Sequence, residues 1–351
     1  MLRPGATIGI LGGGQLGRML SVAAARLGMK THIFEPEDNP PAGQVADAVT
    51  TAPYSDLDAL RRFADSVDVV TFEFENIPTN ALDAIEERRA VHPPRAALAV
   101  SQDRLVEKQF LNDLGLMTAP FAVVDTAGDL VQALGTIGTP GLLKTRRFGY
   151  DGKGQVKITN ADQAAAALKS LGGAPAILEG FVDFEREISV IGARSIDGAV
   201  VCFDPGENVH QSGILHTTTV PAHLTSLQRT DAIILTGQIL NALDYVGVLG
   251  VELFVTTQGP VVNEIAPRVH NSGHWTQNGC VIDQFEQHVR AIAGWPLGDG
   301  LRHADVVMTN LLGDDVNKAQ SLAGDPKNAV HLYGKEDVRT GRKMGHVNRL
   351  K

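Results

Sequence analysis

A glycine-rich turn near the start of the chain lies between a strand pattern and a helix pattern. The run from Gly12 to Gly17, Gly-Gly-Gly-Gln-Leu-Gly, follows the β-rich residues 7–11 and leads into residues 15–27, where apolar side chains recur at helical spacing. Residues 30–34 form a second strand pattern, so the segment is typical of a βαβ unit, whose two strands are parallel. Helix and strand patterns keep alternating beyond it. We therefore expect a doubly wound α/β domain with a parallel sheet in about the first hundred residues.

The same turn indicates an anion site. Glycines let the backbone approach a ligand closely, and the N-terminus of a helix offers unpaired N–H groups. The turn also matches the dinucleotide fingerprint G-x-G-x-x-G, with Glu35 at the end of the second strand, 21 residues beyond Gly14. A nicotinamide or flavin oxidoreductase is therefore one candidate class. A turn that only packs helix on sheet is less favoured, because three consecutive glycines exceed what packing requires.

The chain changes character after Pro93-Pro94. Short strand patterns are then interspersed with a few helix patterns, which favours an α+β region over a second parallel sheet. The expected strands are residues 121–124, 141–144, 155–158, 176–180, 187–192 and 200–204, and the expected helices are residues 103–114, 161–171 and 226–243.

Composition narrows the functional class. The 351 residues carry a net charge of -9, and a general nucleic-acid binder would need a basic surface instead. Residues 331–351 nevertheless hold six Lys or Arg against two acids, which suits either a phosphorylated small ligand or a solvated tail. The two cysteines, Cys202 and Cys280, lack metal-ligand spacing and fit reduced thiols. With neither a secretory leader pattern nor an apolar run of membrane-spanning length, we expect a cytoplasmic protein that binds no membrane.

Two glutamates lie symmetrically about a turn. Glu252 and Glu264 are equidistant from Gln258, so a simple hairpin places their side chains opposite each other on one face. Each lies in an apolar strand, where a pair of unneutralised carboxylates would repel. A hard divalent cation that carries phosphate would hold them together. The alternative, in which bulges shift the register and each glutamate finds its own basic partner, is equally consistent with this segment alone.

A basic, glycine-rich loop argues against the oxidoreductase. Lys144 ends an apolar strand and is followed by a loop that contains Arg146, Arg147 and Lys153 and leads into another strand. Such a loop can close over a polyphosphate, a feature that hydride transfer does not need. It is not a Walker A loop, because G-x-x-x-x-G-K-[ST] is absent. An ordinary basic hairpin is the less favoured alternative.

Together these segments resemble the ATP-grasp superfamily, and more narrowly the 5-(carboxyamino)imidazole ribonucleotide synthases of purine biosynthesis. The broader resemblance rests on Lys144 with the loop 149–154, residues 177–181, residues 185–187, Glu252 and residues 263–264; the narrower one rests on residues 9–18, 146–155, 266–279 and 341–346. The resemblance covers nearly the whole chain. It implies a Rossmann-like domain over residues 1–98, an ATP-grasp domain over residues 99–296 and a small, β-rich C-terminal domain over residues 297–351.

The resemblance also implies a reaction. ATP would phosphorylate bicarbonate to carboxyphosphate, which would carboxylate the amine of 5-aminoimidazole ribonucleotide and leave ADP and phosphate. The implied cofactors are ATP and Mg²⁺, and the implied assembly is a homodimer. The loop around Gly149 would serve as a lid that excludes water.

The family pattern assigns a nucleotide site and a metal site. The residues it places around ATP are Arg104, Lys144, Gly149, Tyr150, Asp151, Gly152, Lys153, Gly154, Gln155, Glu179, Gly180, Phe181, Val182, Glu187, His210, Asn263 and Glu264. Glu179 and Val182 would lie on the segment at the adenine edge, and Glu187 would hold the ribose hydroxyls. His210 is equally consistent with a polar surface histidine in a loop. Magnesium would be held by Glu252 and Glu264.

For the ribonucleotide, the resemblance points to Gly14, Gln15, Leu16, Glu73, His270, Ser272, Lys343 and Arg349. Glu73 and Glu75 alternate with phenylalanines at a strand end, so one of them should face the cleft, and Glu73 is preferred. The expected catalytic residues are Tyr150, Asp151, Lys153 and Arg268. Asp151 and Arg268 would position bicarbonate and the amine, and Arg268 would stabilise the anionic intermediate.

One departure from the superfamily and three alternatives remain. Many ATP-grasp enzymes have a third metal ligand, Asn, two positions after the second glutamate, where this chain has Ala266. The metal would then depend on two carboxylates and water. A formate-using relative acting on another ribonucleotide, a dinucleotide oxidoreductase and a non-catalytic nucleotide-binding regulator stay open, and omission of single substrates separates the first from the carboxylase.

Overall fold

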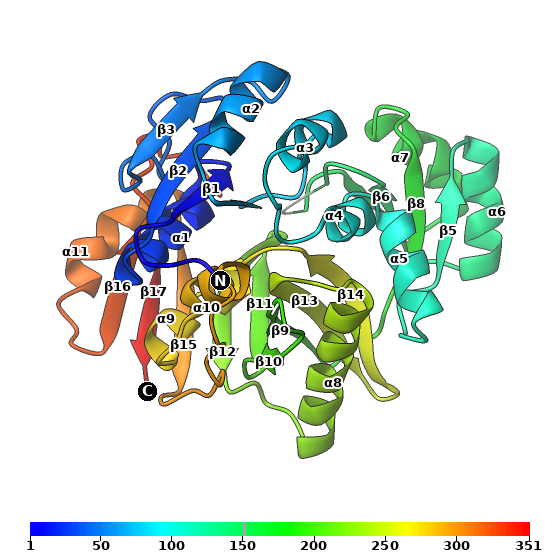
Figure 1. The fold of residues 1–351 in the computed structure, drawn as a ribbon. Helices are drawn as coiled ribbons and strands as arrows, with labels where there is room; N and C mark the ends of the chain where they lie inside the picture. The colour runs from blue at the N-terminus through cyan, green and yellow to red at the C-terminus, as the bar shows by residue number, and fades with distance from the viewer. Residues whose placement is uncertain (150–151) are drawn as a thin grey trace.

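The structure is a computed structural model that describes residues 1–149 and 152–351. Three β-sheets organise it: a four-stranded parallel sheet at the N-terminus, a four-stranded antiparallel sheet in a protruding lobe, and a nine-stranded sheet that carries the rest of the chain (Figure 1). Within the described residues, no helix combines the length and the apolar character that crossing a bilayer requires.

The N-terminal sheet is the predicted parallel α/β unit. Its strand order is β3-β2-β1-β4, and every pairing in it is parallel. Its elements are β1 (Thr7–Leu11), α1 (Gln15–Arg26), β2 (Lys30–Glu35), β3 (Ala48–Thr51), α2 (Leu57–Asp65), β4 (Val69–Phe72) and α3 (Thr79–Glu86). All four residues of β4 are buried, as expected for a strand covered on both faces. The carboxyl ends of β1 and β4 therefore meet beside the glycine turn.

The protruding lobe is a smaller antiparallel sheet in the order β5-β8-β6-β7. Helices α4 (Arg95–Ser101) and α5 (Arg104–Asp113) lead into it, and it contains β5 (Phe121–Val124), α6 (Ala127–Ile137), β6 (Gly141–Thr145), β7 (Gln155–Ile158), the short 3-10 turn η1 (Ala161–Gln163), α7 (Ala164–Ser170) and β8 (Ala176–Gly180). Helices α6 and α7 pack on the sheet through one apolar cluster that includes Leu130, Leu143 and Leu178. The loop from β6 to β7 is the predicted basic lid.

The large sheet has the order β14-β13-β9-β11-β12-β15-β17-β16, with β10 paired to β9. Its elements are β9 (Arg186–Arg194), β10 (Val200–Cys202), β11 (Gly206–Gln211), β12 (Ile214–Val220), α8 (Ser226–Ala242), β13 (Gly247–Thr256), β14 (Gly259–Ala266), η2 (Asn271–Gly273), α9 (Thr276–Gly279), α10 (Gln284–Ala293), β15 (Val306–Leu312), η3 (Gly313–Lys318), α11 (Ala319–Leu322), β16 (Asn328–Leu332) and β17 (Lys343–Leu350). The C-terminal strands thus extend the central sheet through the pairing of β15 with β12.

The three regions are joined by a shared core. One apolar cluster contains Ile8 and Ile10 of β1, Phe285 of α10 and Met308 of β15. Helix α10 contacts both α1 and β13, so it lies between the N-terminal unit and the large sheet. The fold therefore fixes the carboxyl edge of the parallel sheet against the hairpin β13–β14.

A buried histidine connects two of these regions. His288 of α10 accepts the backbone N–H of Val248 at Nδ1, with a distance of 3.1 Å, and its Nε2 lies 2.8 Å from the hydroxyl of Thr71 in β4. Because Nδ1 accepts, Nε2 carries the proton and donates to Thr71. Burial, reinforced by the neighbouring His92, lowers the pKa of His288 to about 3.

The pKa of His288 predicts an acid-sensitive fold. The unfolded chain binds a proton at this residue near pH 6.5 while the folded protein does not, so the stabilisation is complete above pH 6.5 and is lost as pH falls. We expect the free energy of unfolding of the wild type to drop between pH 7 and pH 5 by about 2 kcal/mol more than that of the His288→Gln variant. Urea denaturation at both pH values measures this difference, and equal drops in the two proteins would contradict it.

Candidate active site

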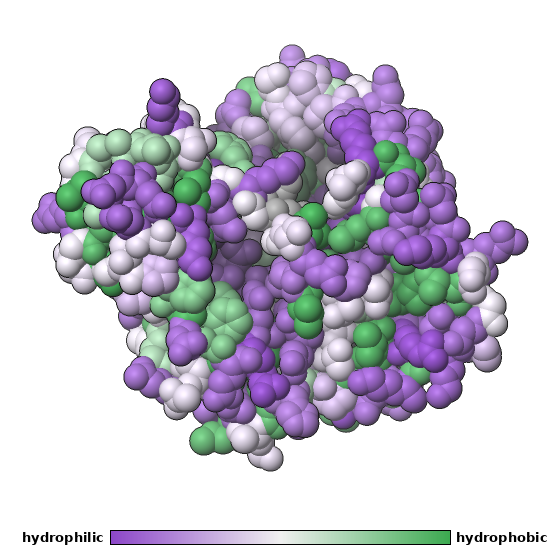
Figure 2. Space-filling view, turned by 180° about the vertical axis from the view of Figure 1, so that it is seen from behind, coloured by the Kyte–Doolittle hydropathy of each residue, from purple (hydrophilic) through white to green (hydrophobic). Residues whose placement is uncertain are grey.

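A large cavity lies where the three regions meet. Its volume is about 680 Å³, and its wall includes residues of the glycine turn, the protruding lobe, the β13–β14 hairpin and β17. Figure 2, which views the molecule from behind, shows a hollow beside the protruding lobe, which lies at the left of that view. Most of the predicted site residues are on this wall: Gln15, Leu16, Glu73, Arg104, Lys144, Gly149, Gly152, Lys153, Gln155, Glu179, Gly180, Phe181, Val182, Glu187, His210, Glu252, Asn263, Glu264, Arg268, His270 and Lys343.

Several predicted residues are not on the wall. Arg349 lies on β17 in an ion pair with Asp325 at 2.6 Å, and its side chain is 55% exposed. Ser272 is fully buried behind His270. Gly14 and Gly154 lie in turns whose neighbours reach the wall. Tyr150 and Asp151 lie outside the described residues.

The two glutamates are opposite each other, and a β-bulge puts them there. The hairpin turn is Thr257-Gln258, since Thr256 pairs with Gly259, and a regular ladder from that turn would place Asn263 opposite Glu252. The register shifts by one residue between Glu252 and Leu253, so Glu264 becomes the partner of Glu252. Without the shift, Glu264 would be on the other face of the sheet. The bulge is therefore what brings the two carboxylates to the cavity.

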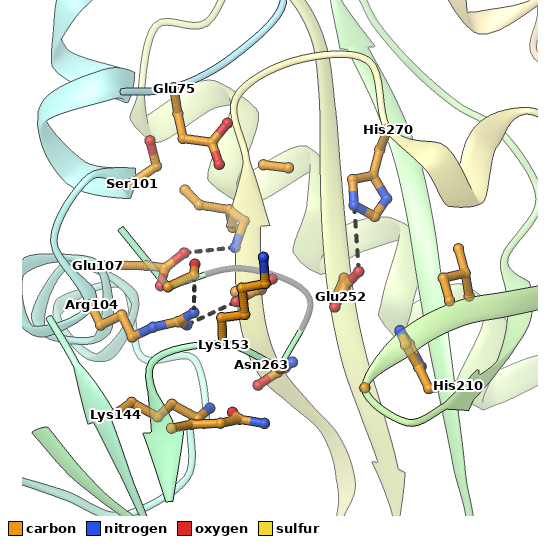
Figure 3. Close-up of a pocket in the computed structure, with 18 of the residues that line it drawn as sticks. Glu75, Ser101, Arg104, Glu107, Lys144, Lys153, His210, Glu252, Asn263 and His270 are labelled. Carbon is orange, nitrogen blue, oxygen red and sulfur yellow. Dashed lines mark hydrogen bonds and ion pairs between the residues drawn. The ribbon is translucent and has the colours of Figure 1, made fainter. Parts of the chain in front are cut away.

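Each carboxylate also has its own basic neighbour. Arg104 Nη1 lies 2.8 Å from Glu264 Oε2, and His270 Nε2 lies 3.5 Å from Glu252 Oε1 (Figure 3). The two glutamates therefore face each other, and each also has the separate basic partner that the alternative predicted. Among the described residues, no group of three or more His, Cys, Asp or Glu is arranged to hold a metal. A cation at this pair would have to complete its shell with phosphate and water.

The pair holds one negative charge near neutral pH. Removal from bulk water, and then the charges of Glu264 and Glu187, raise the pKa of Glu252 to about 8. For Glu264 the same removal from water is outweighed by Arg104, which brings the pKa down to about 2. A divalent cation would favour the charged form of both carboxylates. The pair is therefore suited to bind a divalent cation that arrives together with an anionic ligand.

Buried lysines on the other side of the cavity surround one carboxylate. Lys144 Nζ lies 2.8 Å from Glu179 Oε2, and Lys108 Nζ lies 3.5 Å from Glu179 Oε1. Burial acts to raise the pKa of Glu179, but the two lysines outweigh it and hold the pKa below its usual value. The side chains are almost fully removed from solvent, at 1% exposed for Lys108 and 5% for Glu179. The cluster places fixed positive charge near the glutamate pair, since Lys108 also contacts the carbonyl of Asn263, next to Glu264.

Helix α5 contributes two residues that the sequence reasoning missed. Glu107 accepts the backbone N–H of Ile265 at 2.7 Å, and Lys108 donates to the carbonyl of Asn263 at 3.2 Å. Both contacts are with the bulged segment of β14, so α5 supports the bulge. Burial and the charge of Glu264 raise the pKa of Glu107 to about 8. The spacing of Arg104, Glu107 and Lys108 at i, i+3 and i+4 was the available signal, because such residues share one helix face.

The glycine turn is occupied by the protein's own carboxylates. Glu73 accepts hydrogen bonds from the backbone N–H groups of Gly14 and Gly17, and Glu35 accepts one from Gly13 at 2.6 Å. Burial raises the pKa of Glu73 even though these N–H groups act in the opposite direction. The helix N-terminus does attract an anion, as its geometry predicts. In this structure that anion is Glu73.

Comparison with known proteins identifies the family. The ATP-grasp domain family matches residues 109–285, the ribonucleotide synthetase preATP-grasp domain matches residues 5–102, and the phosphoribosylaminoimidazole carboxylase C-terminal domain matches residues 306–351. The N5-carboxyaminoimidazole ribonucleotide synthase of Brucella melitensis is 54% identical over 100% of this chain and 98% of the relative. The chain belongs to this synthase family. The predictions of an ATP-grasp enzyme, of this family and of the fold class are confirmed.

Solved synthase structures have the same fold. The ADP complex of an N5-carboxyaminoimidazole ribonucleotide synthetase superposes with a TM-score of 0.97 at 41% identity, covering 100% of this chain and 94% of the other. The Aspergillus clavatus synthase in complex with ADP and 5-aminoimidazole ribonucleotide gives a TM-score of 0.93 at 30% identity, covering 99% and 94%. Membership of the synthase family also removes the dinucleotide oxidoreductase from consideration.

Within the synthase site, the two glutamates that follow β4 have different partners. Glu75 forms an ion pair with Arg268 at 2.7 Å, whereas Glu73 is held by the glycine turn. Both glutamates line the cavity, whereas the sequence predicted that only one of them would face it. Burial acts to raise the pKa of Glu75, but Arg268 outweighs it and the pKa is lowered. Arg268 and Glu75 therefore form a charged pair on the wall of the cavity.

The pKa values of two histidines on the cavity wall are shifted in opposite directions. His210 Nδ1 lies 2.9 Å from Glu187 Oε2; burial opposes the cation, but Glu187 outweighs it and the pKa of His210 is raised. Burial, together with Arg268 and Lys343, lowers the pKa of His270 to about 3. His270 packs directly on Gly250, where an added Cβ would lie 2.8 Å from the His270 Cβ. His270 is thus a neutral group held in one place, and His210 lies on β11 with Glu187 as its partner, which does not fit the alternative of a surface histidine in a loop.

Proposed function

We propose that this protein carboxylates the amine of 5-aminoimidazole ribonucleotide with bicarbonate, at the expense of ATP and with Mg²⁺. The observation that carries the proposal is the Glu252–Glu264 pair, which a bulge aligns, with Arg104 in contact with Glu264 and Lys144 on the wall of the same cavity. Opposed carboxylates and cations suit a magnesium-bound triphosphate. The substrate end of the same cavity, with Arg268 and His270, is large enough to take a second ligand next to it.

The reaction proceeds in two steps. A bicarbonate oxygen attacks the γ-phosphorus of ATP, the bond to the β-phosphate oxygen breaks, and carboxyphosphate and ADP form. The amine nitrogen then attacks the carboxyl carbon, phosphate leaves, and the nitrogen loses a proton to give the carbamate product. Bicarbonate is a poor electrophile, which is why phosphorylation comes first. Water must be excluded, because it would hydrolyse carboxyphosphate.

The nucleotide end of the cavity supplies charge. Lys144 and Arg104 would neutralise phosphate oxygens, and Glu252 and Glu264 would hold a metal ion, which would supply Lewis-acid stabilisation of charge on the transferred phosphoryl group. Arg104 lies 2.8 Å from Glu264, and a cation held by the two glutamates would leave its guanidinium available to a phosphate oxygen. Lys153 closes over the phosphates, and the catalytic roles of Tyr150 and Asp151 remain those that the family resemblance implies.

The substrate end of the cavity orients the acceptor. Gln15, Leu16, Glu73, His270 and Lys343 hold the ribonucleotide, with Lys343 supplying charge for its phosphate. Arg268 stabilises the anion that forms during carboxyl transfer, and Glu75 keeps its guanidinium in place. The enzyme acts in the cytoplasm as a homodimer.

Substrate dependence tests this function. We expect phosphate release from ATP to require both bicarbonate and 5-aminoimidazole ribonucleotide, and omission of either to reduce the rate to background. Release that depends on formate in place of bicarbonate would support the formate-using alternative. ATP binding without any release would support the non-catalytic regulator.

A further inference from the structure

A row of buried polar side chains crosses the large sheet and ends at His270. The row begins at Thr218 on β12, continues through Asn208 on β11 and Ser189 on β9, and reaches Ser272 in η2. The successive distances are 2.9 Å from Thr218 Oγ1 to Asn208 Oδ1, 3.1 Å from Asn208 Nδ2 to Ser189 Oγ, and 2.6 Å from Ser189 Oγ to Ser272 Oγ. The last step is 2.8 Å from Ser272 Oγ to His270 Nδ1.

The direction of this row is fixed at its His270 end. The backbone N–H of Ser272 points to His270 Nδ1 at 3.4 Å, and a backbone N–H can only donate. Nδ1 is therefore an acceptor. The Ser272 hydroxyl then donates to Nδ1, Ser189 donates to Ser272, and the Asn208 amide donates to Ser189. The Thr218 hydroxyl completes the row by donating to the Asn208 carbonyl oxygen, so the three hydroxyl protons and one amide proton of Asn208 all point toward His270.

We propose that Thr218, Asn208 and Ser189 are positioning residues that hold His270 as the neutral Nε2–H tautomer, with a hydrogen-bond donor aimed at Glu252 and the cavity. Figure 3 shows the His270 ring pointing at Glu252, where Nε2 lies 3.5 Å from Oε1. In the opposite tautomer, Nε2 would have no proton to donate toward the cavity. The Nε2–H donor is suited to an anionic oxygen of the substrate or of the transferring carboxyl group.

The three positioning residues act through His270 and not on the ligand directly. Their exposed fractions are 0% for Thr218, 5% for Asn208 and 2% for Ser189, and none of them is on the wall of the cavity. Polar side chains at such depth cost stability unless every one is hydrogen-bonded. Ser189 is also the sheet partner of Glu252, so the row and the glutamate pair share a strand register.

The Asn208→Asp variant tests the direction of the row. An ionised carboxylate accepts from both neighbours, so Ser189 must donate to it and Ser272 must donate to Ser189, which leaves Nδ1 of His270 to carry the proton. A protonated carboxyl would instead donate to Ser189 and preserve the wild-type direction. The substitution changes the shape of the side chain very little.

NMR and steady-state kinetics test whether the row sets the tautomer of His270 and whether that tautomer affects kcat. Proton-nitrogen NMR on histidine-labelled, ligand-free protein identifies the protonated nitrogen of His270, and carbon NMR of the new carboxyl reports its ionisation. We expect Nε2–H in the wild type. In the variant we expect Nδ1–H together with a kcat reduced about 10- to 100-fold when the carboxyl is ionised, or Nε2–H with wild-type kcat when it is protonated. The buried Thr236→Val variant, whose hydroxyl bonds only within α8, controls for loss of a buried hydroxyl and should keep the wild-type tautomer and kcat.

Four results would overturn the proposal. They are Nδ1–H in the wild type, Nε2–H beside an ionised carboxyl, a reversed tautomer with unchanged kcat, and a reduced kcat with a protonated carboxyl. The kinetic readout rests on the proposed reaction, whereas the tautomer is measured without substrates. A protein that lacks carboxylase activity but shows the expected tautomers would therefore count against the proposed function alone.

Discussion

Replacing Glu264 with Gln is expected to reduce ATP-dependent phosphate release by about 10²- to 10³-fold, with the fold intact. The change removes one of the two opposed carboxylates while keeping its shape, and it leaves Arg104 facing a neutral amide. We expect the magnesium concentration for half-maximal rate to rise as well, because a single carboxylate remains. Steady-state phosphate release over a magnesium titration measures both effects, and circular dichroism checks the fold.

The matched control for this variant is Glu86→Gln. Glu86 forms an ion pair with Arg95 at 3.2 Å on the outside of the molecule, so its loss removes the same charge far from the cavity. It should leave both the rate and the magnesium dependence within about twofold of wild type, since surface ion pairs contribute little. Equal rates in Glu264→Gln and wild type would show that the pair does not hold the metal.

Replacing Glu179 with Gln is expected to lower the free energy of unfolding by about 3–5 kcal/mol. Lys108 and Lys144 converge on this carboxylate at 3.5 Å and 2.8 Å, and both are buried. Removing the negative charge leaves two desolvated ammonium groups close to each other. Urea denaturation at pH 7 measures the loss, with the exposed Lys157→Gln variant as the control for a charge change in the same lobe.

A double-mutant cycle separates this effect from general disruption. Combining Glu179→Gln with Lys144→Gln removes one of the two ammonium groups, so the pair should be less destabilised than the sum of the single variants, by about 1–3 kcal/mol. Strict additivity would mean that the loss in Glu179→Gln does not arise from unpaired charge.

The glutamate pair shows both the reach and the limit of sequence reasoning. Equal spacing about Gln258 predicted that Glu252 and Glu264 face each other, and they do. The argument from equal spacing was incomplete, because the centre of the turn lies half a residue before Gln258. A bulge at Asn263 shifts the register by one residue and so brings Glu264 opposite Glu252. Glu107 and Lys108, more than 150 residues away in the sequence, form hydrogen bonds with the backbone of the bulged segment. Local sequence patterns do not predict such long-range contacts.

The glycine turn gives the complementary lesson. Its sequence predicted a helix N-terminus that attracts an anion, and backbone geometry alone is enough for that. The occupant is Glu73, which lies 59 residues from Gly14 and reaches the turn only because β1 and β4 are neighbours in the sheet. Periodicity located α1, α5, α7, α8 and most of the central strands, whereas α6, α10, β11, β12 and the C-terminal strands β15, β16 and β17 were not assigned individually. The half-buried, polar-rich patterns of β11 and β12 resemble loops in a single sequence.

A crystal structure with Mg²⁺ and a non-hydrolysable ATP analogue shows whether the glutamate pair and the neighbouring cations bind the nucleotide. We expect the metal to lie between Glu252 and Glu264, the triphosphate to lie against Lys144, and Arg104 to have left Glu264 for a phosphate oxygen. A nucleotide bound elsewhere, or an unchanged Arg104–Glu264 pair with no metal at the two glutamates, would contradict this expectation.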